Sequence, residues 1–244
     1  MTKQPTVKIL IGYHKPSILF KSDILTPIHL GRALVKQPSK DGVLTDKEYQ
    51  WMLDNMIGDD TGDNISEKNR HYNEMTGIYW AWKNYDKLGN PDYFGFFHYR
   101  RLFSFTDAPL SPKDSLEDLI QKTQILNDDV VIDKIRNYDV LTSEMVPANS
   151  FCPDIPLAQK MEMYPLNRLF KVVREQFPNW DPILDAFGKN DKTIYGNMFI
   201  MKRELFFEYC EFCFKILQEY EKILDYKSDN PRRIGFDSEF VTAL

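Results

Sequence analysis

The chain has 244 residues, with 36 acidic and 31 basic side chains and a formal net charge of −5. Hydrophobic residues make up 43% and charged residues 27%, the balance of a soluble globular protein with a sizeable core. The negative charge argues against a general nucleic-acid-binding protein, because such a protein needs a basic surface to release counterions from phosphates. Local basic groups can still bind a small phosphate-bearing ligand.

Cysteine usage and hydropathy indicate where the protein works. An odd number of cysteines, three, does not suggest a disulfide framework, so we expect a reducing, cytoplasmic setting. Cys210 and Cys213 form a C-x-x-C spacing inside an apolar helical pattern, which favours a core role over metal or redox chemistry. No segment resembles a signal peptide or a membrane span. We therefore expect any lipid-linked substrate to be handled at the inner face of the cell membrane.

The first half of the chain opens with a buried strand. The run "TVKILIGYHK" is apolar and β-rich and ends in a polar loop, typical of the first strand of an α/β sheet. From Lys15 to Gly42 no strong periodicity is present, and Pro16 and Pro27 predict loop and short pieces. Residues 45–56 predict a short helix capped by Thr45.

A long helix is the strongest secondary-structure signal. It is predicted over 65–87, with Asn64 as its cap, Glu67 completing a capping box, and Gly89 and Pro91 after its end. The remaining segments alternate in the same manner: a strand in 92–103, a helix in 111–124, a helix and a strand (Asp139–Thr142) in 130–144, helix on both sides of Pro165 in 157–177, a strand at 199–201 leading into a long amphipathic helix, and a polar turn over 228–244. This alternation predicts one α/β domain over residues 1–244.

The predicted helix over 65–87 carries an unusual polar face. Asn69, Asn73, Thr76, Trp80 and, less strictly, Lys83 follow one another at i+3 or i+4 spacing and share that face. Neutral hydrogen-bonding groups beside a tryptophan favour a ligand-binding surface. The alternative is that the two asparagines tie down neighbouring loops.

An acidic run precedes the same helix. Asp59, Asp60 and Asp63 can stabilise the positive end of the helix dipole and cap its free N–H groups. A cation site is the alternative, although the spacing does not match an EF-hand loop.

The stretch "FFHYRRLF" ends a hydrophobic strand in two arginines. In a strand, His98 and Arg100 share one side while Tyr99 and Arg101 share the other. We expect His98 and Arg100 to face a cleft, where a guanidinium can bind phosphate oxygens in a bidentate manner. The alternative is that both arginines pair with carboxylates in a structural network. No nucleophile elbow, Walker loop or G-x-G-x-x-G is present, which leaves hydrolase, P-loop ATPase and dehydrogenase functions without support.

These stretches resemble a bacterial family of capsular and exopolysaccharide biosynthesis proteins. The resemblance rests on "GDDTGDNISEKNRHYNEMTGIYWAWKN", then "DYFGFFHYRRLF", and later "YGNMFIMKRELFFEYC". It also includes "IGYHK" near the start and a weaker "TPIHLGRAL" after it, so it covers nearly the whole chain. The family is similar to nucleotide-diphosphate-sugar-dependent glycosyltransferases with a GT-A-like (Rossmann-like) α/β fold. Some members are similar to galactofuranosyltransferases that use UDP-galactofuranose.

The resemblance implies a hexosyltransferase that moves a sugar, galactofuranose or galactose, from a UDP-sugar to a capsule, exopolysaccharide or O-antigen glycan with inversion. GT-A enzymes commonly hold a metal on an Asp-x-Asp motif, but here the corresponding strand ends His98, Tyr99, Arg100. We therefore expect cationic side chains to neutralise the donor diphosphate without a metal. Mn²⁺ or Mg²⁺ held by the acidic run is the alternative.

Candidate roles follow for individual residues. The resemblance raises Glu239 as the catalytic base, with Asp237 and His98 as the other candidates; the alternative is that Glu239 pairs with an arginine. Tyr13 is expected to stack on the uracil and Lys15 to reach phosphate. The full set of expected donor-binding residues is Tyr13, His14, Lys15, Asn69, Asn73, Trp80, Lys83, His98, Arg100 and Arg101.

Two other classes of protein fit the same sequence. The main rival is a non-catalytic carbohydrate-binding subunit of a polysaccharide assembly system, which would bind sugar without releasing UDP. A nucleotide-sugar mutase or hydrolase is a third, and the missing flavin and nicotinamide fingerprints disfavour a version with a redox cofactor. The expected partners are thus a UDP-sugar and a glycan or lipid-linked glycan acceptor, with no nucleic acid.

Overall fold

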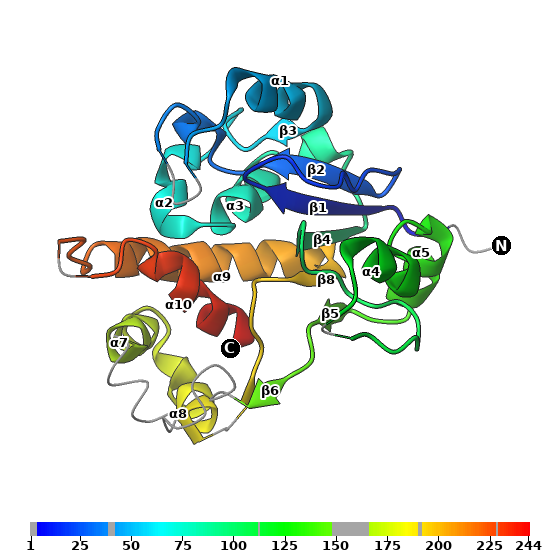
Figure 1. The fold of residues 1–244 in the computed structure, drawn as a ribbon. Helices are drawn as coiled ribbons and strands as arrows, with labels where there is room; N and C mark the ends of the chain where they lie inside the picture. The colour runs from blue at the N-terminus through cyan, green and yellow to red at the C-terminus, as the bar shows by residue number, and fades with distance from the viewer. Residues whose placement is uncertain (1–3, 39–41, 112, 148–165, 190–191, 228) are drawn as a thin grey trace.

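A computed structural model describes residues 4–38, 42–111, 113–147, 166–189, 192–227 and 229–244 (Figure 1). The strands are β1 (Val7–Tyr13), β2 (Leu25–His29), β3 (Ile57–Gly58), β4 (Tyr93–His98), β5 (Val140–Thr142), β6 (Val146–Pro147), β7 (Lys192–Thr193) and β8 (Phe199–Lys202). The α-helices are α1 (Asp46–Asn55), α2 (Asn69–Tyr72), α3 (Met75–Lys83), α4 (Leu116–Thr123), α5 (Asp128–Ile135), α7 (Leu166–Gln176), α8 (Asp181–Lys189), α9 (Arg203–Glu221) and α10 (Arg233–Ala243). Short 3₁₀ turns lie at Arg32–Leu34, Ser66–Lys68, Tyr85–Leu88 and Pro178–Trp180.

A six-stranded sheet in the order β3-β2-β1-β4-β8-β5 organises the fold. Strands β1 to β4 are parallel to one another, whereas β8 is antiparallel to both β4 and β5. In an open sheet of this kind, ligands bind where the parallel strands end at their carboxyl termini. The α/β, GT-A-like fold predicted from the sequence is confirmed by this sheet and its flanking helices.

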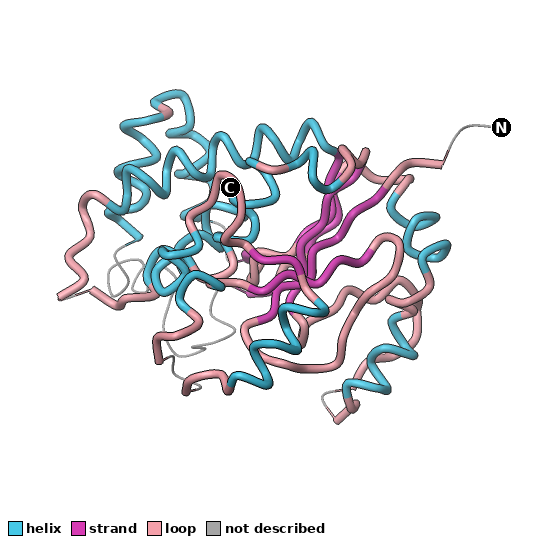
Figure 2. Tube along the Cα trace, turned by 90° about the horizontal axis from the view of Figure 1, so that it is seen from above, coloured by secondary structure: helices cyan, strands magenta, loops and turns pink. Residues whose placement is uncertain are grey.

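Helices cover both faces of the sheet, as the view in Figure 2 shows. Leu10, Phe94 and Phe96 point to the face covered by α3 and α9 and belong to the larger hydrophobic cluster. Ile9 and Phe97, at the alternate positions, pack on the other face with residues of α1 and α5. Because side chains alternate along a strand, residues fully buried on both faces require the nearly continuous apolar runs seen in β1 and β4.

Several predicted elements are confirmed. β1 and β4 lie where the apolar runs indicate, and β8 leads into the amphipathic helix α9. Thr45 caps α1 in a capping box with Glu48, as its position before the helix predicts. Cys210 and Cys213 are both free and fully buried in α9, in the expected core positions. The predicted helix before Pro165 lies outside the described residues. No described helix is both long and apolar enough to traverse a bilayer.

Strand β2 was not predicted, because Pro27 lies inside it. The structure shows why proline is tolerated there. Leu30 donates its N–H to Tyr13 of β1 (2.8 Å), and backbone groups alternate sides along a strand, so position 27 faces away from β1. On that outer side β3 pairs with β2 only from Ile28 onward. Pro27 therefore removes no ladder hydrogen bond.

The single helix predicted over 65–87 is wrong. The structure has a 3₁₀ turn, α2, α3 and a second 3₁₀ turn, with a break at Asn73, whose φ is 48° and ψ is −128°. Asn64 accepts a hydrogen bond from the Ser66 N–H (3.1 Å) at the first of these turns. The helical periodicity is correct, but tertiary contacts at Asn73 interrupt it.

The polar turn predicted at the end of the chain is also wrong, since α10 occupies residues 233–243. Ile234 and Val241, seven residues apart, are buried on one side of this helix. Gly235 faces α2 so closely that an added Cβ would lie 1.9 Å from the Asn73 amide nitrogen. The helix is thus stabilised by packing rather than by a strong local pattern.

Candidate active site

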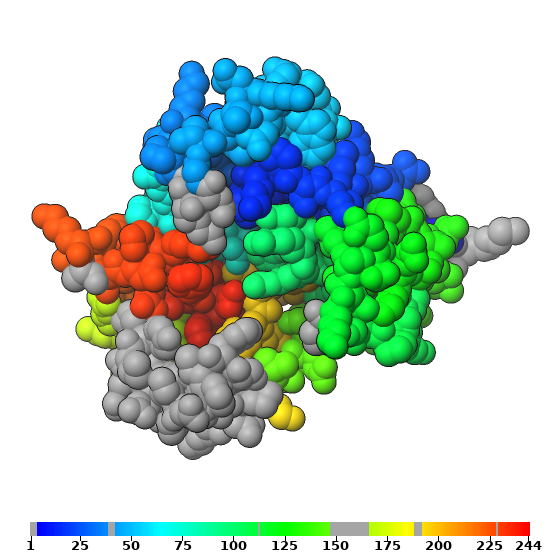
Figure 3. Space-filling view, in the orientation of Figure 1, coloured from blue at the N-terminus to red at the C-terminus, as the bar shows by residue number. Residues whose placement is uncertain are grey.

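A cavity of about 860 Å³ lies at the carboxyl ends of the parallel strands. Its lining comes from four separate stretches within residues 12–44, 69–74, 98–101 and 230–239. In Figure 3 the blue N-terminal part lies above the orange-to-red C-terminal part on the near face. The fold therefore gathers the candidate residues of β1, α2, β4 and α10 around one space.

The segment after β4 places two arginines on the cavity. The strand ends at His98, and the chain turns so that the Arg101 N–H donates to the His98 carbonyl (3.0 Å). Alternation along a strand no longer applies in this turn, so Arg100 and Arg101 both line the cavity and are both exposed. Neither forms an ion pair with a carboxylate of the described residues. The expected separation of the two arginines onto opposite sides is wrong.

Tyr99, at the start of the same turn, fixes the turn by packing into the core. Its ring is 4% exposed and stacks on Tyr13 with 5.3 Å between ring centroids. The Arg100 guanidinium also lies over this ring, 5.0 Å from its centroid. The Tyr13 hydroxyl donates to the Ile18 carbonyl (2.9 Å) and accepts from the Phe20 N–H (2.9 Å). Tyr13 thus supports the turn from the core and does not line the cavity.

His98 and His29 are histidines whose surroundings keep them neutral. Burial lowers the pKa of His98, Glu74 opposes this, and the positive charges of Arg101 and Arg100 lower it further. Its Nε2 is buried and has no hydrogen-bond partner among the described residues, which leaves it available to a ligand in the cavity. Burial and two neighbouring positive groups lower the pKa of His29 to about 3.

Glu239 and Glu74 form a pair of carboxylates on the cavity wall. Glu239 projects from α10 and Glu74 from the start of α3, and both line the cavity. Burial raises the pKa of Glu239 to about 7, and the negative charge of Glu74 adds to the rise. A hydrogen bond from the Gly196 N–H and the positive charge of Arg101 act in the opposite direction, and the negative charge of Asp237 adds a smaller rise. A carboxylate with this pKa is well matched to proton transfer near neutral pH.

Asn197 fixes the relative positions of these two carboxylates. Its amide nitrogen donates to Glu74 Oε1 (2.7 Å) and to Ser238 Oγ (2.8 Å). Ser238 directly precedes Glu239 in the chain. The Asn197 amide oxygen accepts from Thr242 Oγ1 (2.8 Å), one turn further along α10. Asn197 is 2% exposed, so the loop before β8 clamps α10 to the start of α3.

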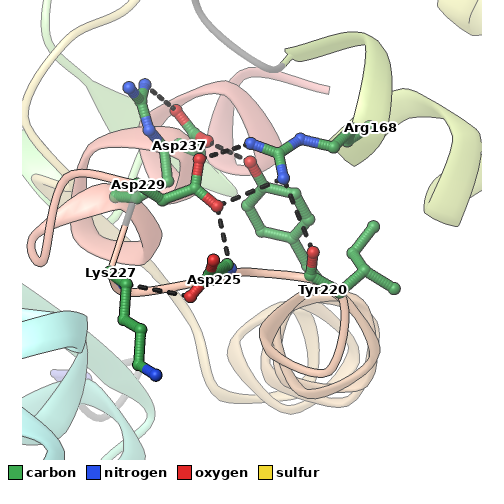
Figure 4. A network of polar contacts seen from close by, with 8 residues as sticks. Arg168, Tyr220, Asp225, Lys227, Asp229 and Asp237 are labelled. Atoms are coloured by element: carbon green, nitrogen blue, oxygen red, sulfur yellow. Dashed lines mark hydrogen bonds and ion pairs between the residues drawn. The ribbon is translucent and has the colours of Figure 1, made fainter.

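Asp237 lies on the opposite side of α10 from the cavity, within the polar network shown in Figure 4. Its carboxylate accepts from the Tyr220 hydroxyl (2.7 Å) and pairs with Arg233 (3.4 Å). Nearby, Arg168 of α7 binds Asp229 through both terminal nitrogens. Burial raises the pKa of Asp237 to about 6. Asp237 therefore links α10 to α9, and the cavity does not reach it.

The α2 segment presents two asparagines to the cavity, and both also hold the backbone. Asn69 donates to the Asn73 carbonyl (2.7 Å) and to Thr76 Oγ1 (2.9 Å). The Asn73 amide oxygen accepts from Arg232 Nε (2.9 Å) at the start of α10. Asn73 adopts a backbone conformation that non-glycine residues rarely occupy, which is found where the surroundings fix a functional segment. The two asparagines therefore hold neighbouring backbone segments, as the alternative prediction stated, and they also line the cavity.

Asp59 is a buried carboxylate at the centre of a group of hydrogen bonds near these residues. One carboxylate oxygen accepts from the Gly31 N–H (2.7 Å) and Thr76 Oγ1 (2.7 Å), and the other from the Arg32 N–H (3.1 Å) and Ser66 Oγ (2.5 Å). Asp59 is fully buried, and burial raises its pKa while the four hydrogen bonds lower it. It therefore joins the loop after β2 to α3.

The three carboxylates of the acidic run have different surroundings. All four hydrogen bonds to Asp59 come from N–H and O–H donors, Asp63 is exposed and accepts from the Tyr79 hydroxyl (3.2 Å), and Asp60 lies beside Arg32 near Gly58. Among the described residues, no three His, Cys, Asp or Glu side chains are grouped so that they could hold a metal ion.

The structure brings together only part of the predicted donor-binding set. His14, Asn69, Asn73, His98, Arg100 and Arg101 line the cavity, and Lys15 is not among the lining residues. Trp80 is 3% exposed and donates to the Thr61 carbonyl (2.8 Å), beside a separate cavity of about 620 Å³. Lys83 lies over the Trp82 ring, 3.3 Å from its centroid, outside both cavities. The i+3 and i+4 spacing failed for these two because the helix breaks at Asn73.

Among the lining residues that were not identified from the sequence are His29, Glu74, Arg232 and Phe236. Glu74 stands within the "NEMT" part of the quoted motif, so a carboxylate between two polar helix positions was a usable signal. His29 is the last residue of β2, a strand that was not predicted because Pro27 lies inside it. Arg232 and Phe236 come from a segment read as a turn, and only the helix α10 gives them a common face.

Comparison with known proteins gives a similar solved structure and a family match. The chain is similar to the solved apo structure of WbbM, a bifunctional glycosyltransferase, with a TM-score of 0.78 and 26% sequence identity. The match covers 98% of this chain but 41% of that one, so the chain spans about two-fifths of the length of its structural relative. A sequence search of curated proteins finds no significant match. Residues 8–244 match the model of a family described as a domain of unknown function, DUF4422, and the chain belongs to that family.

Proposed function

We propose that the protein is a nucleotide-sugar-dependent glycosyltransferase that moves a sugar from a UDP-sugar to a glycan acceptor. The observation that carries this proposal is the single cavity that brings two exposed arginines and a carboxylate of raised pKa together at the carboxyl ends of the parallel strands. The sugar is galactofuranose or galactose and the acceptor a growing capsule, exopolysaccharide or O-antigen glycan, free or lipid-linked. The reaction takes place in the cytoplasm, at the inner face of the membrane when the acceptor is lipid-linked.

The arginines of the turn after β4 bind the donor diphosphate in this proposal. Arg100 and Arg101 are exposed on the cavity and have no carboxylate partner among the described residues, so their donors are available to phosphate oxygens. Negative charge grows on the departing UDP as the glycosidic bond breaks, and fixed cations stabilise it there. The charges of both arginines and of Glu74 act on His98, and in this proposal its Nε2 donates or accepts one hydrogen bond with the ligand.

Glu239 acts as the base. It accepts the proton of the attacking acceptor hydroxyl, while the hydroxyl oxygen forms the new bond to the anomeric carbon and UDP leaves with the electrons of the old bond. One displacement of this kind inverts the anomeric configuration. Because a base acts in its deprotonated form, kcat/KM is expected to rise with pH through about 7.

A UDP-release assay tests the proposal against its main rival. UDP- and other nucleotide-sugars are first compared by the thermal shift that they produce, and the best stabiliser is then assayed for release of the nucleotide with glycan acceptors. Glycosyl transfer predicts acceptor-dependent UDP release. Binding of sugars without UDP release would favour the carbohydrate-binding subunit instead, and UDP release without a glycosylated product would favour a hydrolase.

Metal removal tests the role of the arginines separately. The diphosphate is neutralised by guanidinium groups in this proposal, so we expect EDTA to change the rate of transfer by less than about twofold. The measurement is turnover before and after chelation, with Mn²⁺ or Mg²⁺ added back. A strong loss of turnover that either ion restores would contradict neutralisation of the diphosphate by Arg100 and Arg101. The proposal of glycosyl transfer would still stand.

Replacing Glu74 by glutamine tests the carboxylate pair. Glutamine keeps the oxygen that accepts from Asn197 but removes the negative charge that raises the pKa of Glu239. The pKa of Glu239 is therefore expected to fall, and the rising limb of the kcat/KM profile to move to lower pH by about 0.5–1 unit. An unchanged profile would show that Glu74 does not act on the titrating group.

A further inference from the structure

Helix α10 presents one polar and aromatic face to the cavity. Arg232, Phe236 and Glu239 stand at i, i+4 and i+7 and all line the cavity, while Asp237 and Ser238 are buried on the other side. With a rise of 1.5 Å per residue, the backbone of Phe236 lies about 4.5 Å along the helix axis from that of Glu239. That offset is about the width of one sugar ring.

Phe236 is unusual among the residues around this space. Its side chain is 40% exposed, whereas Tyr99, the other large aromatic residue in the described lining, is 4% exposed. The Arg232 guanidinium lies over the Phe236 ring, 5.1 Å from its centroid, and Arg232 is held in turn by Asn73 (2.9 Å). The ring is thus held at the cavity wall, while much of its apolar surface remains uncovered.

An exposed aromatic ring with polar groups at its edges matches the chemistry of a sugar. The C–H groups of a sugar ring form an apolar surface that packs on an aromatic face, and its hydroxyls point outward to hydrogen-bonding partners. Along α10, Arg232 precedes Phe236 by four residues and Glu239 follows it by three, so polar side chains flank the ring along the helix. A sugar on Phe236 would therefore have a hydroxyl within reach of the Glu239 carboxylate.

We propose that Phe236 is the platform on which the acceptor sugar stacks, with Arg232 and Glu239 binding hydroxyls at its two edges. The proposal rests on the function proposed above, because it assigns this surface to the acceptor rather than to the donor. The reason is position: the acceptor hydroxyl must meet Glu239, and Phe236 is one helical turn from it. The diphosphate-binding arginines come from the turn after β4, a separate element of the wall.

Direct binding measurements on the intact chain and two variants test the platform. The probes are octyl glycosides of galactopyranose, galactofuranose, glucose and mannose, and UDP serves as the probe of the donor side. In Phe236→Ala the affinity for the bound glycoside is expected to fall about tenfold, because the stacking surface is gone. Phe236→Trp is expected to retain binding, and its new indole to change fluorescence on addition of the glycoside. UDP affinity is expected to change by less than about twofold in both variants.

Tyr138→Ala is the matched control, since Tyr138 is 46% exposed and lies outside the cavity lining. It is expected to bind glycoside and UDP as the wild type does. The platform is overturned if no glycoside binds the wild type, if Phe236→Ala binds glycoside normally, or if it loses UDP affinity instead. If glycoside binding depends on Phe236 but no UDP-sugar is bound or turned over, the platform stands and glycosyl transfer fails.

Discussion

Replacement of Glu239 by glutamine is expected to lower the rate of glycosyl transfer by about 10²–10⁴-fold, the usual contribution of a positioned general base. Glutamine has nearly the same shape and its amide oxygen can still accept from the Gly196 N–H, so the cavity wall is preserved. Only the ability to take a proton from the acceptor is removed. The measurement is kcat with saturating donor and acceptor, together with UDP affinity, which is expected to change by less than about twofold.

Asp237→Asn is the matched control, because it alters a carboxylate two residues away on the buried side of α10. This change weakens the contacts with Tyr220 and Arg233 and is expected to lower the free energy of unfolding by about 1–3 kcal/mol. Its kcat in the folded protein is expected to stay within about threefold of the wild type. Near-normal turnover of Glu239→Gln would remove Glu239 from the mechanism and leave His98 and Glu74 as the bases to test.

Replacement of Asp59 by asparagine is expected to lower the free energy of unfolding by about 2–4 kcal/mol. Each carboxylate oxygen of Asp59 accepts from one backbone N–H, that of Gly31 or of Arg32. Either orientation of an asparagine therefore places its NH₂ group against a backbone N–H in a fully buried site. Thr76 and Ser66 can rotate their hydroxyls to adapt, but the backbone cannot. Urea unfolding measures the loss.

Asp63→Asn is the control for this change, since Asp63 belongs to the same acidic run but is exposed. An asparagine oxygen there can still accept from the Tyr79 hydroxyl, so its free energy of unfolding is expected to change by less than about 0.5 kcal/mol. Equal stability of Asp59→Asn and wild type would contradict the structural role of Asp59. A wild-type stability that rises strongly with Mg²⁺ or Mn²⁺, with no such rise in Asp59→Asn, would return Asp59 to the candidate metal ligands.

The residues that were located correctly from the sequence are those whose position depends on local pattern. The apolar runs of β1 and β4 identify strands that are covered on both faces, and the polar loops that follow them place His14 and His98 at the carboxyl ends of a parallel sheet. The capping box at Thr45 likewise depends only on neighbours in the chain. These features follow from backbone geometry and burial over a few residues.

The residues that were misplaced are those whose conformation depends on distant partners. A continuous helix would keep Asn69, Asn73, Thr76, Trp80 and Lys83 on one face, but the contacts of Asn73 with Arg232 and Gly235, about 160 positions later, accompany the break. The turn at Tyr99 brings Arg100 and Arg101 to the same cavity because Tyr99 packs on Tyr13. No local periodicity carries such information.

By itself, the sequence determined the α/β class and the strands whose ends carry the polar groups, because each depends on residue type and short spacing. The candidate base Glu239 was implied by the family resemblance. Only the tertiary structure decided that α10 is a helix, that Glu74 stands beside Glu239 through Asn197, and that Asp237 and Asp59 belong to buried networks. The physical reason is that the environment of a carboxylate depends on its neighbours in space. Burial, opposing charges and available donors decide whether it titrates near pH 7 or holds the fold together.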